Sequence, residues 1–140
     1  MLDSELLQEL DDASHKSSGT ARLPDDAAAA YVQRIAETCV GDPCTTYWWD
    51  SLKVPATRVP YGEAAGLAII EDWLGDRADV RLVVTDDEGP PWPVYAGTAR
   101  QLVAILRECR FCEFMMGAKD ASWVVFDTHM NELVCVGLDV

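Results

Sequence analysis

The stretch SWVVFDTHMNELVCVG, Ser122–Gly137, decides the fold. Two runs rich in β-branched and aromatic residues flank the polar segment His129-Met130-Asn131, and this pattern predicts two strands joined by a turn. In the first run Val125 points to one face of the strand while Val124 and Phe126 point to the other, so both faces are apolar. A strand of this kind is typical of the interior of a sheet.

Asp127 and His129 stand where the apolar run ends, and two interpretations are open for them. Polar residues at such a position commonly bond to the backbone of the turn itself, and this structural role is the favoured interpretation. The alternative is acid–base chemistry, with His129 as general base and Asp127 as its orienting carboxylate. That chemistry also needs a nucleophile from elsewhere in the chain. The other histidine, His15, falls in a predicted loop.

The pattern along the whole chain predicts a single α+β domain over residues 1–140. Helices are expected at 1–14, 25–39, 62–76 and 98–109, and strands at 45–52, 79–89, 91–97, 112–118, 122–128 and 132–137. The start of the last helix is marked by a capping box of Thr98 and Gln101. We expect a mixed or mostly antiparallel sheet with helices packed on one face, ending in a three-strand meander.

The N-terminal segment is predicted to be a short helix that a flexible loop connects to the rest of the domain. Leu2, Leu6, Leu7 and Leu10 recur at helical spacing, which predicts an amphipathic helix over residues 1–14. Residues 15–24 contain Ser, Gly and Pro and are expected to form a flexible loop. The helix is therefore a candidate mobile arm or self-association element.

The charge of the chain narrows the classes of partner. Its 140 residues carry 24 acidic and 11 basic side chains, a formal net charge of −13. Such a field repels phosphate backbones and anionic lipids, so nucleic acid and membrane are not expected partners, whereas a cationic protein is. Acidity for solubility alone is the alternative. Without an apolar segment long enough for a membrane or a signal peptide, a cytoplasmic location is expected.

Five cysteines raise the question of a metal site. The pairs Cys39/Cys44 and Cys109/Cys112 have spacings that a four-thiolate zinc site permits. The segment between Cys109 and Cys112 lacks the glycine and turn residues of a zinc knuckle, and buried cysteine commonly packs as a small apolar residue. We therefore expect reduced thiols, no metal and no cofactor.

Aromatic and acidic residues form the candidate binding surface. Trp48 and Trp49 are adjacent in a predicted strand, so one indole is expected in the core and the other against a helix, solvent or a partner. Three acids at the end of a strand precede a proline-rich turn with a tryptophan, a combination suited to Arg or Lys side chains. The candidate partner-binding residues are Trp48, Trp49, Asp86, Asp87, Glu88, Trp92, Asp127 and His129.

The C-terminal pattern, LRECRFCEFMMG followed by a Trp-x3-Asp-x-His hairpin, resembles small bacterial α+β proteins, some of them similar to immunity proteins of polymorphic toxins. The resemblance covers about the last 40 residues. It implies a fold more than an activity. Together with the acidic, aromatic-rich surface, it leads to the hypothesis of an acidic cytoplasmic immunity protein that binds and occludes a cationic toxin without turnover. Two alternatives stay open: a small hydrolase using Asp127 and His129, and a regulatory module that forms a homodimer through its N-terminal helix.

Overall fold

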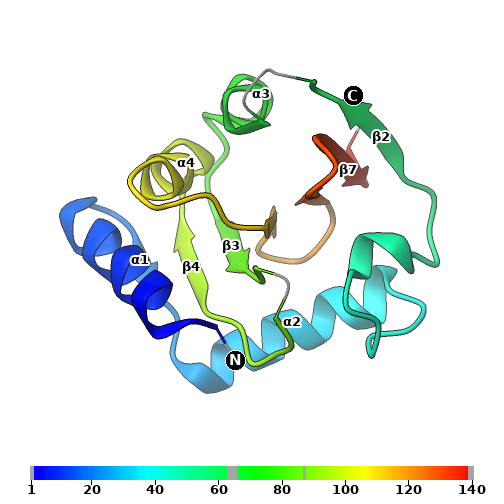
Figure 1. Ribbon diagram of the computed structural model, residues 1–140, viewed down its shortest axis with the longest axis horizontal. Helices are drawn as coiled ribbons and strands as arrows, with labels where there is room; N and C mark the ends of the chain where they lie inside the picture. The colour runs from blue at the N-terminus through cyan, green and yellow to red at the C-terminus, as the bar shows by residue number, and fades with distance from the viewer. Residues whose placement is uncertain (1, 63–65, 87, 139–140) are drawn as a thin grey trace.

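The computed structural model describes residues 2–62, 66–86 and 88–138, which form four α-helices and one seven-stranded sheet (Figure 1). The helices are α1 (Ser4–Lys16), α2 (Asp25–Cys39), α3 (Gly66–Leu74) and α4 (Ala99–Arg107). The strands are β1 (Ala21–Arg22), β2 (Thr57–Pro60), β3 (Val80–Val84), β4 (Val94–Gly97), β5 (Phe114–Ala118), β6 (Val124–Asp127) and β7 (Glu132–Val136). None of the helices in these ranges has the length and apolar character needed to cross a lipid bilayer.

The sheet has the order β1-β4-β3-β5-β6-β7-β2, and every strand pairs with its neighbours in antiparallel fashion. The expected α+β class and the terminal meander, β5-β6-β7, are confirmed. The sequence did not predict the two outermost strands, β1 and β2. Both are short and exposed, and β2 ends at Pro60, whose missing N–H is tolerated at a sheet edge.

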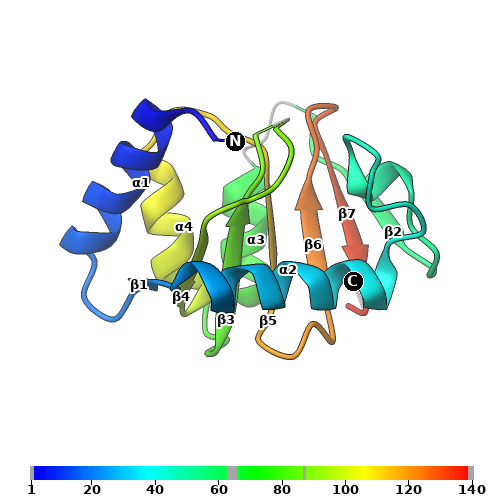
Figure 2. The ribbon, with the colours of Figure 1, turned by 90° about the horizontal axis from the view of Figure 1, so that it is seen from below.

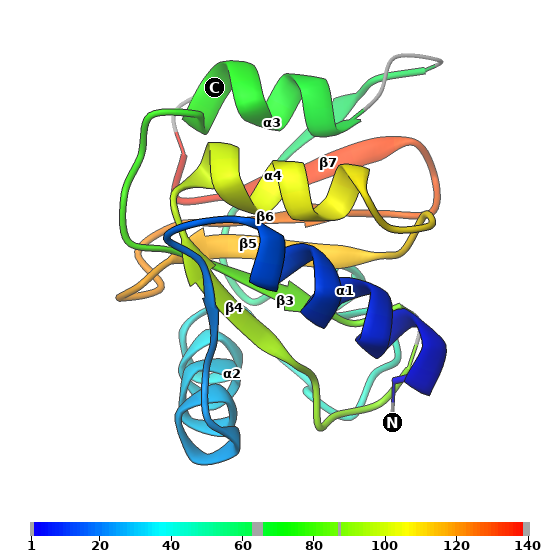
Figure 3. The same cartoon turned by 90° about the vertical axis from the view of Figure 1, so that its left-hand side faces the viewer.

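Helices cover both faces of the sheet, which corrects the expectation that they pack on one face. The leucine and isoleucine side chains of α1, α3 and α4 share one core with Leu82, Met116 and Val125. On the other face α2 packs over Met115 and Val124. Figure 1 shows α1, α4 and α3 on one side of the strands and α2 on the other. Figure 3 shows α3 and α4 above the strands and α2 below them, and in Figure 2 α2 runs across the strands.

The first helix is docked rather than mobile. Leu6 and Leu10 are completely buried in the core that α3 and α4 also form. The segment expected to be a flexible loop contains β1, which extends the sheet beyond β4. The leucine face proposed for self-association is therefore covered within the same chain, and a dimer through it would require α1 to leave its place.

Residues 45–52 do not form the expected strand. They contain a 3-10 turn, Trp48–Asp50, and only Leu52 makes an isolated bridge, to Val40. The indole N–H of Trp48 donates to the carbonyl of Pro43, which closes the loop on itself. Trp48 and Trp49 are both buried in the core on the α2 side, so the burial of two large indoles overrides the local β-propensity.

The contact between α2 and the sheet generates a test of this arrangement. Tyr31 of α2 donates its hydroxyl to the carbonyl of Ala118 at 2.7 Å, and a Cβ added at Gly117 would lie 2.6 Å from the Tyr31 oxygen. We expect Gly117→Ala to lower the free energy of unfolding by about 1–3 kcal/mol because the core cannot take the extra methyl group. Urea denaturation measures the change.

The double variant Gly117→Ala with Tyr31→Phe is the matched control, because it removes the oxygen that the methyl group meets. We expect the combined loss to be smaller than the sum of the two single losses. Strict additivity would show that Tyr31 does not approach Gly117 as the structure has it.

Candidate functional site

Two buried carboxyl groups lie at the same end of the sheet. Glu113 directly precedes β5 and Asp127 ends β6, and the antiparallel register pairs Phe114 with Asp127. Glu113 is 5% exposed and Asp127 is 4% exposed. Ionisable groups buried to this extent are uncommon unless they are paired or functional, so this end of the sheet is the candidate functional site.

The two carboxyl groups have different partners. Asp127 accepts a hydrogen bond from the hydroxyl of Tyr61, at 2.8 Å, beside the start of α3. Glu113 forms a hydrogen bond with His129, with 2.7 Å between Oε1 and Nδ1. The Asp127–His129 pair considered from the sequence is therefore replaced by two separate pairs, one with Tyr61 and one with Glu113.

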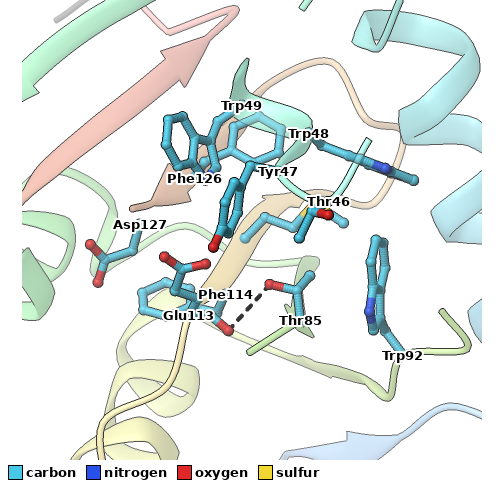
Figure 4. A pocket seen from close by; sticks show the side chains of 11 residues that line it. Thr46, Tyr47, Trp48, Trp49, Thr85, Trp92, Glu113, Phe114, Phe126 and Asp127 are labelled. Carbon is cyan, nitrogen blue, oxygen red and sulfur yellow. Dashed lines mark hydrogen bonds between the residues drawn. The ribbon is translucent and has the colours of Figure 1, made fainter. Parts of the chain in front are cut away.

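Aromatic rings surround the Glu113–His129 pair. The imidazole of His129 lies with its ring centre 4.8 Å from Tyr47 and 5.5 Å from Trp49, and its side chain is 43% exposed. In Figure 4 the Tyr47 ring stands near Trp49 with its hydroxyl toward Glu113. The cavity beside these rings has a volume of about 20 Å³, room for about one water molecule.

The Tyr61–Asp127 pair, in contrast, lines an open cleft with a volume of about 460 Å³. The cleft lies between the start of α3, the end of α4 and the segment before β5, and its walls include Leu67, Leu106 and Phe111. The Asp127 carboxyl group is bonded at Oδ1. Within the described residues, Oδ2 of Asp127 has no hydrogen-bond partner.

Burial controls the ionisation of Asp127. Desolvation raises the pKa of its carboxyl group from 3.8 to about 6, although the Tyr61 hydrogen bond acts in the opposite direction. The folded state therefore favours the protonated form, and stability that is present below pH 4 is lost as the pH rises through about 6. The buried carboxyl group therefore lowers the free energy of unfolding at neutral pH by on the order of 3 kcal/mol relative to its value below pH 4. Residues that lower stability in this way are often kept for function.

The turn chemistry expected of Asp127 and His129 is performed by the residue between them. Thr128 Oγ1 and its backbone N–H both donate to the carbonyl of Glu132, at 3.0 and 3.1 Å, and Oγ1 also accepts from the N–H of Met130. Asn131 adopts the positive φ of +53° that the turn requires. The hairpin end is thus confirmed, and its polar neighbours Asp127 and His129 are left for other contacts.

Of the other candidate residues, Trp48, Trp92 and Glu88 do not line this cleft. Asp86 lies near it, since its backbone N–H donates to the carbonyl of Glu113 at 3.0 Å and its charge acts on Arg110 and Cys112 of the cleft. Trp48 and Trp92 are buried and meet edge to face at 4.9 Å beside a groove of about 840 Å³ between α1, α2 and the Pro90–Pro93 segment. Asp86 is half-buried and Glu88 is exposed, whereas Asp87 lies outside the described residues. The indole of Trp92 donates to the carbonyl of Glu88, so this loop is tied to the core.

The cysteines do not converge on one point. Cys39 belongs to the core on the α2 side, whereas Cys112 belongs to the opposite core and Cys109 packs against it. In the part of the chain that the structure describes, no three metal-ligating side chains come together. Burial raises the pKa of Cys39 to about 11, which disfavours the thiolate that a metal would need.

Three residues of the site were missed from the sequence: Tyr61, Phe111 and Glu113. Tyr61 is 66 residues from Asp127, and it reaches that residue because β2 pairs with β7. The burial of Glu113 could have been predicted from its position. An acid directly before an apolar strand that is buried on both faces is expected to lie in or near the core.

A scan against protein-family models found no match for this chain, and neither the curated proteins nor the solved structures compared with it gave one. The site therefore has to be interpreted from its own geometry.

The ionisation of Asp127 generates a stability test. We expect Asp127→Asn to raise the free energy of unfolding at pH 8, because the amide keeps an acceptor for Tyr61 and removes the buried charge. The gain should be roughly twice as large at pH 8 as at pH 5, where the folded carboxyl group is mostly protonated. Urea denaturation at both pH values measures it. A gain or loss independent of pH would show that the buried carboxyl group does not titrate as described.

Proposed function

We propose that this chain is an acidic binding protein that occludes a cationic protein partner, as an immunity protein does with its toxin, and that the contact surface is the end of the sheet around the cleft. The observation that carries the proposal is the exposure of Phe111 and Met130. They are 72% and 63% exposed and are the large apolar side chains left open in the described part of the chain. Phe111 lines the cleft, and Met130 is next to Asn131, which lines it too.

Exposed large apolar side chains ringed by polar groups are the usual anatomy of a protein interface. Phe111 and Met130 lie on the two segments that flank the β5–β6 pair, so they come from one end of the sheet. Their side chains contribute little to the fold at these exposures, which makes their apolar character hard to explain by stability alone.

The charges at this end favour a cationic partner. Arg58 is paired with Glu132, and Arg110 is bonded to Asp3 and lies 3.8 Å from Glu9. The basic side chains there are thus already neutralised within the chain, and the formal net charge of −13 is left to act outward. A field of this sign speeds the encounter with a basic surface and repels nucleic acid and anionic lipids.

The same proposal places the protein in the cytoplasm, and the five cysteines, all free thiols, support a reducing compartment. The hydrolase alternative has less support, since Asp127 is bonded to Tyr61 and His129 to Glu113, so the Asp127–His129 pair on which it rests is not formed. A homodimer through α1 also has less support, because Leu6 and Leu10 are buried.

The test uses co-expression with a basic protein that the purified chain captures from its native cell, with growth as the first readout and the affinity of the purified pair as the second. We expect the wild type to protect the cell. The double variant Phe111→Ser with Met130→Ser should lose protection and weaken binding by about 30-fold or more, because anchor residues each contribute on the order of 1–2 kcal/mol.

The control variant carries Ala29→Ser and Ala104→Ser, which alter exposed positions of α2 and α4 and should bind like the wild type. If the double anchor variant binds and protects as well as this control, the proposed surface is wrong. If the wild type gives neither binding nor protection, the proposed partner class is wrong.

A further inference from the structure

We infer that the cleft beside Tyr61 and Asp127 receives an arginine side chain of the cationic partner, an inference that rests on the proposed function and names the contact at its centre. The cleft combines mainly apolar walls with one buried carboxyl group. An arginine side chain has the matching form, an apolar stem that ends in a charged guanidinium group.

The apolar and aromatic residues that line the cleft suit the methylene chain and the planar guanidinium group of an arginine. Leu67 and Leu106 come from α3 and α4, and Phe111 and Phe114 add two aromatic rings. A guanidinium group stacks on aromatic faces and is less strongly hydrated than an ammonium group, so it enters such a cleft at lower desolvation cost than lysine does. A volume of about 460 Å³ leaves room for the whole side chain.

The carboxyl group suits the cation because, within the described residues, its second oxygen has no hydrogen-bond partner. Tyr61 holds Oδ1 of Asp127 and thereby fixes the carboxyl group that lines the cleft. Burial raises the pKa of Asp127 to about 6, so the carboxylate at neutral pH lacks the counter-charge that a guanidinium group would supply.

The chain's own charged groups near the cleft are engaged elsewhere. Arg110, at its rim, is bonded to Asp3 and lies close to Glu9, both at or near α1. Glu113 is bonded to His129. The thiol of Cys112 is kept protonated because burial raises its pKa to about 12. Asp86 acts on Arg110 and Cys112 without lining the cleft, so Asp127 is the carboxyl group in the cleft wall that an incoming cation can neutralise.

The experiment uses two small probes rather than the partner, at pH 7.5: N-acetyl-arginine methylamide and its neutral counterpart N-acetyl-citrulline methylamide, which has nearly the same shape. Binding is followed in ¹H–¹⁵N spectra. We expect the arginine probe to shift the resonances of Tyr61, Phe111 and Asn131 saturably, with a Kd of about 1–10 mM, typical of a fragment of this size. The citrulline probe should bind at least about tenfold weaker.

Two variants with the same change of net charge make the test specific. Asp127→Asn should reduce the affinity for the arginine probe to that of citrulline, whereas Asp72→Asn, at an exposed position of α3, should leave it unchanged. The dispersion of the spectra reports whether each variant is folded. If Asp127→Asn fails to fold, Leu67→Trp, which fills the cleft, should abolish binding in its place.

Equal affinity for the two probes, an equal loss in Asp72→Asn, or the absence of saturable shifts would each overturn the inference. Tighter binding of the corresponding lysine probe would overturn the choice of arginine. None of these results touches the proposed function, which is tested with the whole partner on Phe111 and Met130, so the two can fail separately.

Discussion

Burial on both faces of β5 and β6 is the constraint on which the rest of the structure depends. Consecutive side chains of a strand point to opposite faces, and here each face meets its own core, so Val125 packs toward α3 and α4 while Val124 packs toward α2. Neither strand has a solvated face. Polar residues are therefore excluded from both strands until the helical layers end, and the transition is abrupt at Glu113 and at Asp127.

The same constraint separates the two carboxyl groups. They lie at one end of the sheet, yet Asp127 is paired with Tyr61 and Glu113 with His129. A shift of one residue in the pairing of β5 with β6 would reverse which side chains face which core, so the register that fixes the core also fixes these two pairs. The geometry of the candidate site thus depends on correct pairing of the central strands, and the hydroxyl of Thr128 stabilises the turn after β6.

Local signals in the sequence were sufficient for α2, for the start of α4 and for the terminal meander. The capping box of Thr98 and Gln101 is present in full, since such motifs depend on residues three apart. The prediction of a strand over residues 45–52 was wrong, because the tertiary burial of two indoles overrides the local propensity for strand. The second helical layer was missed although its signal was present, since a strand with two apolar faces requires cover on both. Asp127 and His129 could be nominated from the sequence, but their partners Tyr61 and Glu113 could not, because strand order brings them together.

The position of Asp127 connects stability to recognition. A carboxyl group that burial pushes toward its protonated form destabilises the native state at neutral pH, and an amide of the same shape would not. Such a residue is explained if a cation from a partner completes the site. The carboxylate loses its hydration on folding, and its attraction to the bound cation compensates for that loss. The acidic surface would then bring a basic partner to this end of the sheet, and Asp127 would select the arrangement in which one of its arginines enters the cleft. In the proposed complex, long-range charge and the buried carboxylate would have different tasks: the first would govern the rate of encounter, and the second would govern which encounter persists.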